Sequence, residues 1–236
     1  MTLQDKKVVV IGGSDGMGLA TAEAALAAGA VVVIASRSEA KLKAAAAHLG
    51  GSVETAVLDA TVEDDVRALF ARLGPIDHVV TTAAVVSRKP VFEVSLDEAK
   101  SAFDNKFWSQ FIVCRNAHAQ IRPGGSITLF SGISSRRGLP SLVVASAING
   151  AVEALCRSMA LTLAPVRVNA VCPGYVDTPS HDASPARRAV LDAVAARLPV
   201  QRVGHPDELA RAALFLMQSE YSTGSVVDVD GGHLAG

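Results

Sequence analysis

Short apolar runs alternate with longer alanine- and leucine-rich segments along the whole chain. Strands are predicted at residues 7–11, 31–36, 53–58, 78–81, 126–130, 166–171 and 225–229. Most of these runs are apolar on both faces, which is typical of parallel strands covered by helices on two sides. Helices are predicted at residues 16–28, 39–48, 62–73, 96–121, 142–163 and 207–217. The pattern therefore predicts an α/β fold, a doubly wound parallel sheet of about seven strands with helices on both faces.

The length of the chain is typical of one large α/β domain, and no linker, repeat or low-complexity segment divides it. We therefore expect a single domain that comprises residues 1–236. One stretch, at about 173–205, is rich in Pro, Ser, Asp and Arg and has no clear strand or helix pattern. A long irregular segment in a compact domain usually serves function, so we expect a substrate or lid loop there.

Charge and composition exclude several classes of partner. The net charge is −1, which gives no electrostatic case for nucleic acid or an anionic membrane surface. No apolar stretch is expected to be long enough to span a bilayer, and the N-terminus lacks the apolar region of a signal peptide. The three cysteines are widely spaced and predict buried thiols in a cytoplasmic protein, with no metal site.

A glycine cluster follows the first predicted strand and opens the first predicted helix. It reads Gly12-Gly13-Ser14-Asp15-Gly16-Met17-Gly18. Gly12 permits a tight turn, Gly16 lets the backbone approach a pyrophosphate, and Gly18 allows close packing of helix against strand. The helix N-terminus then faces the phosphates. In this position the cluster predicts a dinucleotide-binding site of the Rossmann type.

The spacing Gly-x-x-x-Gly-x-Gly resembles that of the short-chain dehydrogenase/reductase family, and the resemblance extends over essentially the whole chain. Thr81-Thr82-Ala83-Ala84 stands where the family has Asn-Asn-Ala-Gly, and residues 167–174 resemble its Pro-Gly turn and the strand before it. Asp230-Gly231-Gly232 resembles its C-terminal signature. The resemblance implies a nicotinamide cofactor held by Gly12, Ser14, Asp15, Gly16, Met17, Gly18, Asp59, Ala60, Thr82, Ala83, Pro173, Gly174, Val176 and Thr178.

Cofactor choice is predicted from the end of the second strand. An acid there would bind the ribose 2′-hydroxyl of NAD and repel a 2′-phosphate. This chain instead has Ser36, Arg37 and Ser38, a guanidinium between two hydroxyls that suits a phosphate. Asp15 opposes this interpretation, because the corresponding position is basic in many NADP-preferring relatives. We expect NADP(H) to be favoured over NAD(H).

The resemblance also implies a Ser, Tyr and Lys catalytic set, and the alignment places none of the three here. The tyrosine position falls on Ala145, the lysine position on Asn149 and the serine position on Gly132. Lys106 aligns with a family asparagine on the preceding helix. We therefore expect Lys106 and Asn149 to be exchanged between facing helices, the alternative being that Asn105 is the family asparagine and Lys106 a surface residue.

Three further residues are candidates for catalysis. Ser131 and Ser134 flank the serine position, and either one serves in its place or both simply bond backbone at the strand end. Tyr175 directly follows Pro173-Gly174 at the nicotinamide end of the expected cleft, where it lines a substrate pocket or acts as an acid.

The favoured function is an NADP(H)-dependent oxidoreductase of atypical active site that transfers hydride to or from a small carbonyl, alcohol or related substrate. A non-catalytic dinucleotide-binding protein, either a redox sensor or an inactive oligomer partner, is the alternative, and a lyase or isomerase is a third hypothesis. The resemblance implies a homodimer or homotetramer formed through helices 96–121 and 142–163.

Overall fold

The computed structural model describes residues 2–51, 53–82, 89–178 and 184–235. Seven strands form one parallel sheet in the order β3-β2-β1-β4-β5-β6-β7. The strands are β1 (Lys7–Ile11), β2 (Val31–Ser36), β3 (Glu54–Val57), β4 (Ile76–Thr81), β5 (Ile121–Phe130), β6 (Arg167–Pro173) and β7 (Val226–Val229). The chain order reverses direction beside β1, between β1 and β4. The predicted doubly wound α/β fold is confirmed, and such folds bind ligands at the carboxyl ends of the strands beside this reversal.

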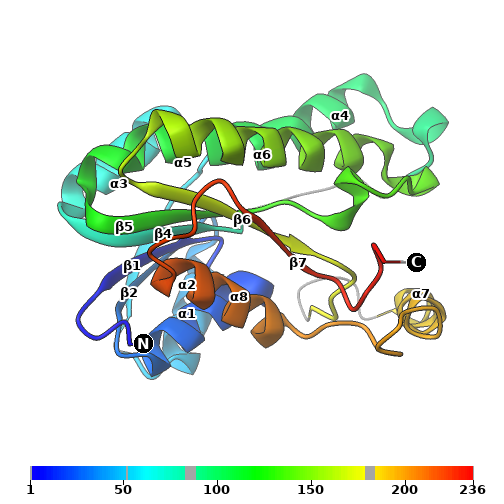
Figure 1. Cartoon of the computed structure of the whole chain (residues 1–236), viewed down its shortest axis with the longest axis horizontal. Helices are drawn as coiled ribbons and strands as arrows, with labels where there is room; N and C mark the ends of the chain where they lie inside the picture. The colour runs from blue at the N-terminus through cyan, green and yellow to red at the C-terminus, as the bar shows by residue number, and fades with distance from the viewer. Residues whose placement is uncertain (1, 52, 83–88, 179–183, 236) are drawn as a thin grey trace.

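Helices cover both faces of the sheet (Figure 1). One layer contains α3 (Glu63–Leu73), α4 (Leu96–Phe103), α5 (Ser109–Ala117) and α6 (Val143–Thr162). The other contains α1 (Gly16–Ala27), α2 (Glu39–His48) and α8 (Pro206–Gln218). Successive residues of β1 serve the two layers alternately: Val9 and Ile11 pack with the first, Val8 and Val10 with the second. This two-sided burial explains the continuous apolar runs of the sequence.

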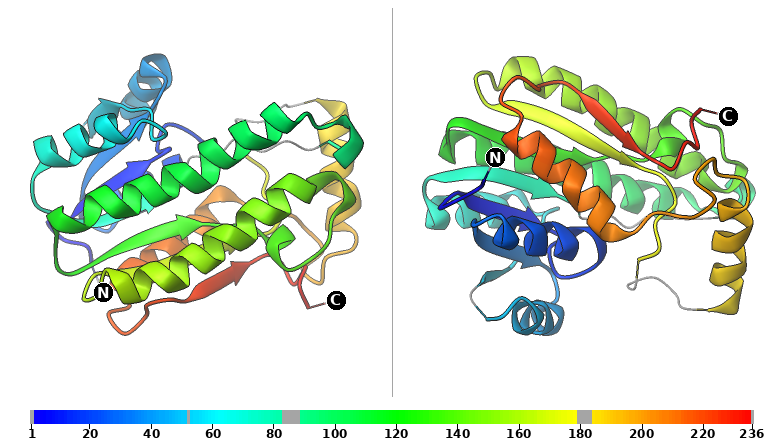
Figure 2. Two further views of the ribbon diagram at one scale, coloured as in Figure 1. Left: turned by 90° about the horizontal axis from the view of Figure 1, so that it is seen from above. Right: turned by 60° about the horizontal axis from the view of Figure 1, so that its bottom comes forward.

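The long helix predicted at 96–121 is interrupted. After α4 the chain makes a π-helical turn at Asp104–Trp108, continues as α5, and tightens into a 3₁₀ turn at His118–Gln120. β5 then begins at Ile121, five residues earlier than expected. A π turn inserts an extra residue into the helix and is frequent at functional sites. Figure 2 shows this helical segment and α6 side by side on one face of the sheet.

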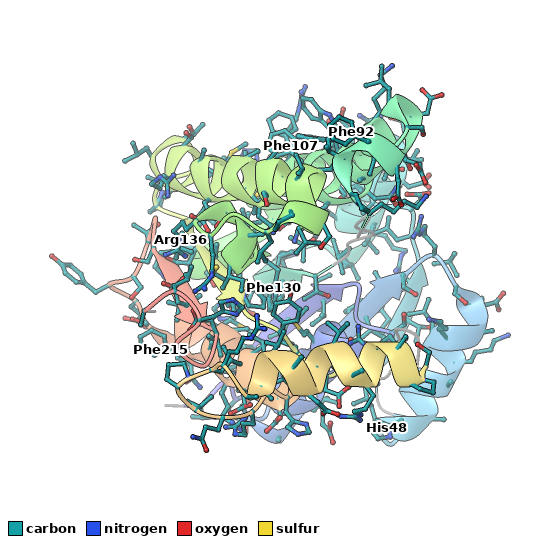
Figure 3. All side chains as sticks on the ribbon, turned by 90° about the vertical axis from the view of Figure 1, so that its right-hand side faces the viewer. His48, Phe92, Phe107, Phe130, Arg136 and Phe215 are labelled. Carbon is teal, nitrogen blue, oxygen red and sulfur yellow. The ribbon has the colours of Figure 1, made fainter. Side chains whose placement is uncertain are left out.

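The sequence predicted an irregular loop over residues 173–205, but part of this stretch is helical. It contains α7 (Pro185–Ala195), which begins at the N-cap residue Ser184 and lies beyond the carboxyl ends of the strands. Figure 3 looks onto that edge, with α7 in the foreground and Phe130 above it in the view. The segment therefore places a helix, as well as loop, beside the expected site.

The expectation that no segment has the length and apolarity of a membrane span was wrong. Pro140–Thr162 has both. In the fold this segment includes α6, which buries Ile148, Val152 and Cys156 in the core against the sheet. A core helix of a folded domain meets the same criteria, so length and composition alone do not assign it to a bilayer.

Candidate functional site

A cavity of about 370 Å³ lies at the carboxyl ends of β1 to β4. It gathers most of the residues predicted to hold a dinucleotide: Gly12, Ser14, Asp15, Gly16, Met17, Gly18, Ser36, Arg37, Ser38, Asp59, Ala60, Thr82 and Thr178. Ala83 lies outside the described residues. We call this space the dinucleotide cavity.

Two glycines explain the shape of its floor. Gly12 has φ +83°, a conformation that L side chains rarely adopt, and it turns the chain sharply after β1. At Gly18 a Cβ would lie 2.1 Å from the Gly12 carbonyl oxygen and 2.5 Å from Thr82 Oγ1. The first turn of α1 can therefore approach the β1–α1 loop only because residue 18 has no side chain. Asp15 caps this helix by accepting a hydrogen bond from the Gly16 amide at 2.8 Å.

The end of the cavity beside β2 is positively charged. Arg37 and Lys41 both line it, and Lys41 forms an ion pair of 3.1 Å with Asp15. This pair offsets the acid that opposed a phosphate at the sequence level. The Ser36 hydroxyl is shielded from solvent and has no hydrogen-bond partner among the described residues. A phosphate group fits this set, because it would accept from the hydroxyl and from both cations.

Asp59 lies at the end of β3, in the same cavity. The Thr61 hydroxyl and the Thr61 amide donate hydrogen bonds to its carboxylate at 2.7 and 3.0 Å. These bonds lower the pKa of Asp59 below its ordinary value, since they stabilise the ionised form. Asp59 is thus held as an acceptor, which suits a ligand group that donates a hydrogen bond.

A second cavity, of about 190 Å³, continues from the first toward α6 and α7. The two share Met17, Thr82 and Thr178 in their walls. The second holds the other predicted residues, Pro173, Gly174, Val176, Lys106, Ser131, Ser134, Asn149 and Tyr175. We call it the inner cavity. All five catalytic candidates therefore lie around one space, next to the dinucleotide cavity.

Lys106 points inward from the π turn and is 7% exposed. Its Nζ donates to the Ser131 carbonyl oxygen at 2.8 Å and to Asn149 Oδ1 at 2.6 Å. Gln110, one turn further on, accepts from the Phe130 amide and donates to the Phe130 and Lys106 carbonyls, which fastens the helix to β5. The lysine side chain is therefore held in place by backbone and amide acceptors.

Asn149 connects Lys106 to a hydroxyl. Its Nδ2 donates to Ser134 Oγ at 2.9 Å, so a chain of hydrogen bonds runs from the π turn through α6 to the loop after β5. A Cβ added at Gly132 would lie 2.7 Å from the same Nδ2. A side chain at position 132 and the present placement of Asn149 are therefore incompatible without movement. Ala145, one turn earlier on α6, also lines the inner cavity.

Ser131 has a different environment from Ser134. Its hydroxyl donates to Glu153 Oε1 at 3.3 Å, and Ser135 donates to the same oxygen at 2.6 Å. Glu153 is 5% exposed and lies 3.5 Å from Arg136, which also binds Asp228. The buried Glu153 side chain therefore holds the loop after β5 through Ser131 and Ser135. Of the two candidate serines, Ser134 is the one whose hydroxyl bonds to Asn149 and so joins the Lys106–Asn149 chain.

Asn105 and Lys106 both line cavities, although a regular helix would turn one of them away. Lys106 faces the inner cavity, and Asn105 faces the dinucleotide cavity, where its Oδ1 accepts from Arg37 at 3.1 Å. The alternative that made Lys106 a surface residue was wrong, because this side chain is 7% exposed and lines the inner cavity. The assignment of Asn105 as the family asparagine stays a prediction. The π turn changes the angular step along the helix at these residues.

Tyr175 lines the inner cavity. Its ring stacks on His233, with ring centroids 5.7 Å apart and planes at 14°. Burial lowers the pKa of His233, so its imidazole favours the neutral form. The stacked pair joins the loop after β6 to the C-terminal segment and shapes one wall of the cavity.

Sequence reasoning missed Lys41, Arg187 and Glu153. Lys41 stands three residues after the N-cap Ser38, so it lies in the first turn of α2, close to Arg37 and Ser38. This spacing could have identified it from the sequence. Arg187 lies within the stretch predicted as irregular, where no side-chain direction was assignable. No sequence pattern around Glu153 marks it as a site residue, because its link to the site is the pair of hydrogen bonds from Ser131 and Ser135 in the loop after β5.

Comparisons with known proteins agree with this geometry. A family model described as enoyl-(acyl carrier protein) reductase matches residues 12–233. L-xylulose reductase of Bos taurus is 33% identical over 247 residues, which cover 100% of this chain and 99% of that protein. A short-chain dehydrogenase/reductase of Stachybotrys chlorohalonatus is 30% identical over 251 residues, covering 98% of each.

A comparison with solved structures also finds similarity to dehydrogenases. A structure described as a small-chain dehydrogenase in complex with NADPH superimposes with a TM-score of 0.86 at 34% sequence identity, covering 99% of this chain and 100% of that one. The superposition therefore extends over nearly the whole of both chains. The chain therefore belongs to the short-chain dehydrogenase/reductase family.

Proposed function

We propose that this protein is an NADP(H)-dependent oxidoreductase that transfers hydride to or from a small carbonyl or alcohol substrate. The observation that carries the proposal is the pair of joined cavities, one with a phosphate-compatible end and the other with a buried lysine. The relative described in complex with NADPH and the reductase names of other relatives support it.

Preference for NADP(H) over NAD(H) rests on the β2 end of the dinucleotide cavity. Arg37, Lys41 and the Ser36 hydroxyl would hold the 2′-phosphate, and Lys41 also neutralises Asp15. Gly12, Gly18 and the N-terminus of α1 would hold the pyrophosphate, and Thr178 would contact the nicotinamide end. The 2′-phosphate is the group that distinguishes the two cofactors, so these cations decide between them.

The catalytic set that we propose is atypical for the family. No phenol or ammonium group occupies the positions of Ala145 and Asn149, where the resemblance places the catalytic tyrosine and lysine. Lys106 supplies an ammonium group from the facing helix instead. Asn149 and the Ser131 carbonyl hold its Nζ in place, and Asn149 also fixes Ser134.

The bound nicotinamide supplies or accepts the hydride. In reduction, Lys106 donates a proton to the substrate oxygen as negative charge develops there, and in oxidation it receives that proton back. Ser134 orients the same oxygen through its hydroxyl. Tyr175 and the apolar residues of the inner cavity exclude water from the reacting atoms.

The test combines cofactor binding with turnover. NADPH and NADH are titrated by fluorescence, and turnover is screened with carbonyl, imine and activated-alkene substrates. Lys106→Met should abolish most turnover and leave NADPH affinity within a few-fold, whereas the control Lys100→Met, on an exposed site of α4, should change neither. If NADPH binds tightly but no substrate class is turned over, the protein is a non-catalytic dinucleotide-binding protein.

We also propose that the protein works as a homodimer or homotetramer paired through α4–α5 and α6. An edge-to-face series of aromatic rings runs along α4, the π turn and α5: Phe103, Phe107, Trp108 and Phe111. Three of these rings are partly buried against the core, and Trp108 is the most exposed member. Trp108 is 47% exposed, and Phe107 lies on the outer part of this layer in Figure 3. Partly exposed aromatic rows of this kind are enriched at protein–protein interfaces.

A further inference from the structure

The inner cavity has an unusual balance of charge. Its described lining residues include two cations, Lys106 and Arg187, and no Asp or Glu. The remaining walls are largely apolar, with Ile133, Leu139, Leu142, Ala145 and Leu191 among them. A neutral substrate would leave the Arg187 guanidinium without a counter-charge among the described residues, and a low-dielectric wall strengthens its attraction for an anion.

The two cations come from different parts of the fold. Lys106 extends from the π turn between α4 and α5, whereas Arg187 extends from the first turn of α7, which lies across the carboxyl edge of the sheet (Figure 3). Lys106 is held by the Ser131 carbonyl and Asn149, beside the position proposed for the substrate oxygen. Arg187 is therefore the cation available to a second polar group of the substrate.

The contacts of Arg187 aim it at the cavity. Its Nη2 donates to the Val176 carbonyl at 3.3 Å and lies 3.5 Å from Thr178 Oγ1, both of which are cavity residues. In the described part of the chain, no carboxylate lies within ion-pair distance of its guanidinium. The neighbouring Arg188, by contrast, pairs with Asp177 at 3.2 Å and does not line the cavity. A guanidinium held by neutral acceptors matches a carboxylate in two-point geometry.

We propose that the substrate is a small aliphatic oxo acid or the corresponding hydroxy acid, with its carboxylate bound by Arg187 and its carbonyl oxygen placed at Lys106 and Ser134. This inference rests on the proposed oxidoreductase function and names its substrate class. Arg187 is a specificity residue in this assignment. It lines the inner cavity and not the dinucleotide cavity, which separates a substrate carboxylate from a cofactor phosphate as its ligand.

The experiment compares 3-oxobutanoate with 3-oxobutanamide, which have nearly the same size and differ in charge. Each is titrated by calorimetry into the protein with NADP⁺ and without it, and each is assayed for turnover with NADPH. The acid should bind and react at least about tenfold better than the amide, the ratio expected for a charge-assisted hydrogen bond. Arg187→Gln should remove most of this preference, Arg187→Lys should keep part of it, and the matched control Arg188→Gln should keep all of it.

Two results would overturn the inference. One is an acid-to-amide ratio that is the same in the wild-type protein and in Arg187→Gln. The other is a loss of NADP⁺ affinity of about tenfold in Arg187→Gln with the ratio intact, which would assign the arginine to a cofactor phosphate. Failure of NADP⁺ to bind the wild-type protein would instead overturn the proposed function, and the titrations without dinucleotide would still decide the acid preference.

Discussion

Exchanging Lys106 and Asn149 tests whether these two residues act as one unit. The comparison uses four proteins: the wild type, Lys106→Asn, Asn149→Lys and the double variant. In the wild type, one ammonium group donates to two buried acceptors at 2.6 and 2.8 Å. A hydrogen bond to a charged group contributes about 1.5–3 kcal/mol, so Lys106→Asn should lower the free energy of unfolding by at least about that amount for each of the two bonds that it loses.

Asn149→Lys alone should be at least as harmful, for a different reason. It would bring a second ammonium group close to Lys106 Nζ in place of the Asn149 Oδ1 acceptor. Two unit charges about 4 Å apart repel by roughly 4 kcal/mol at an effective dielectric constant of 20. The double variant removes that repulsion and restores one cation with an amide partner. The loss of unfolding free energy in the double variant should therefore be about 2–4 kcal/mol smaller than the sum of the losses in the two single variants.

Urea unfolding at neutral pH measures this coupling directly, because each variant gives a free energy of unfolding from the linear extrapolation. Turnover gives a second readout: Lys106→Asn should reduce kcat by about 10²–10⁴-fold if the lysine transfers the proton. Effects that add to within about 0.5 kcal/mol would refute the reasoning, since independent sites behave in that way. Equal turnover in the wild type and Lys106→Asn would leave the network with a purely structural role.

The remaining predictions concern the cofactor, pH and assembly. Arg37→Gln should reduce the preference for NADPH over NADH by about tenfold in a fluorescence titration, and an unchanged ratio would assign the phosphate to Lys41 alone. His78 is a buried residue of β4 whose Nδ1 lies 2.9 Å from Ser126 Oγ. Burial lowers its pKa to about 4 from 6.5, so the stability that the neutral imidazole contributes is complete above pH 6.5 and is lost as pH falls toward 4. Unfolding free energy should decline by about 2 kcal/mol between roughly pH 7.5 and 5 from this group, and His78→Gln should lack that part of the decline. Trp108→Asp should shift light-scattering mass toward the monomer; a wild-type protein that is already monomeric at micromolar concentration would contradict the proposed pairing.

The fold could be predicted because its signals are local. Buried parallel strands are apolar on both faces, and glycine and proline mark where they stop, so the strand positions agree to within a few residues apart from the early start of β5 at Ile121. That the glycine cluster lines a cavity was also predictable, since Gly12 to Gly18 lie in one segment at the end of one strand.

The π turn at Asp104–Trp108 was not predictable from periodicity. A single inserted residue leaves the pattern of apolar positions nearly unchanged, yet it turns Asn105 and Lys106 toward two different cavities. The helix α7 was missed because its apolar face is short and most of its residues are exposed. Arg187 was missed with it.

The sequence by itself determined the α/β class, the strand that carries the glycine loop, and the absence of a lysine at position 149. Each of these depends on residue type and spacing over a few turns of chain. Only the tertiary structure decided that Lys106, Asn149 and Ser134 form one chain of hydrogen bonds, that Lys41 neutralises Asp15, and that Arg187 faces the inner cavity. These contacts join residues 15 to 43 positions apart or residues on separate walls of the cavity, and their distances follow from how the helices pack on the sheet, which local propensity does not encode.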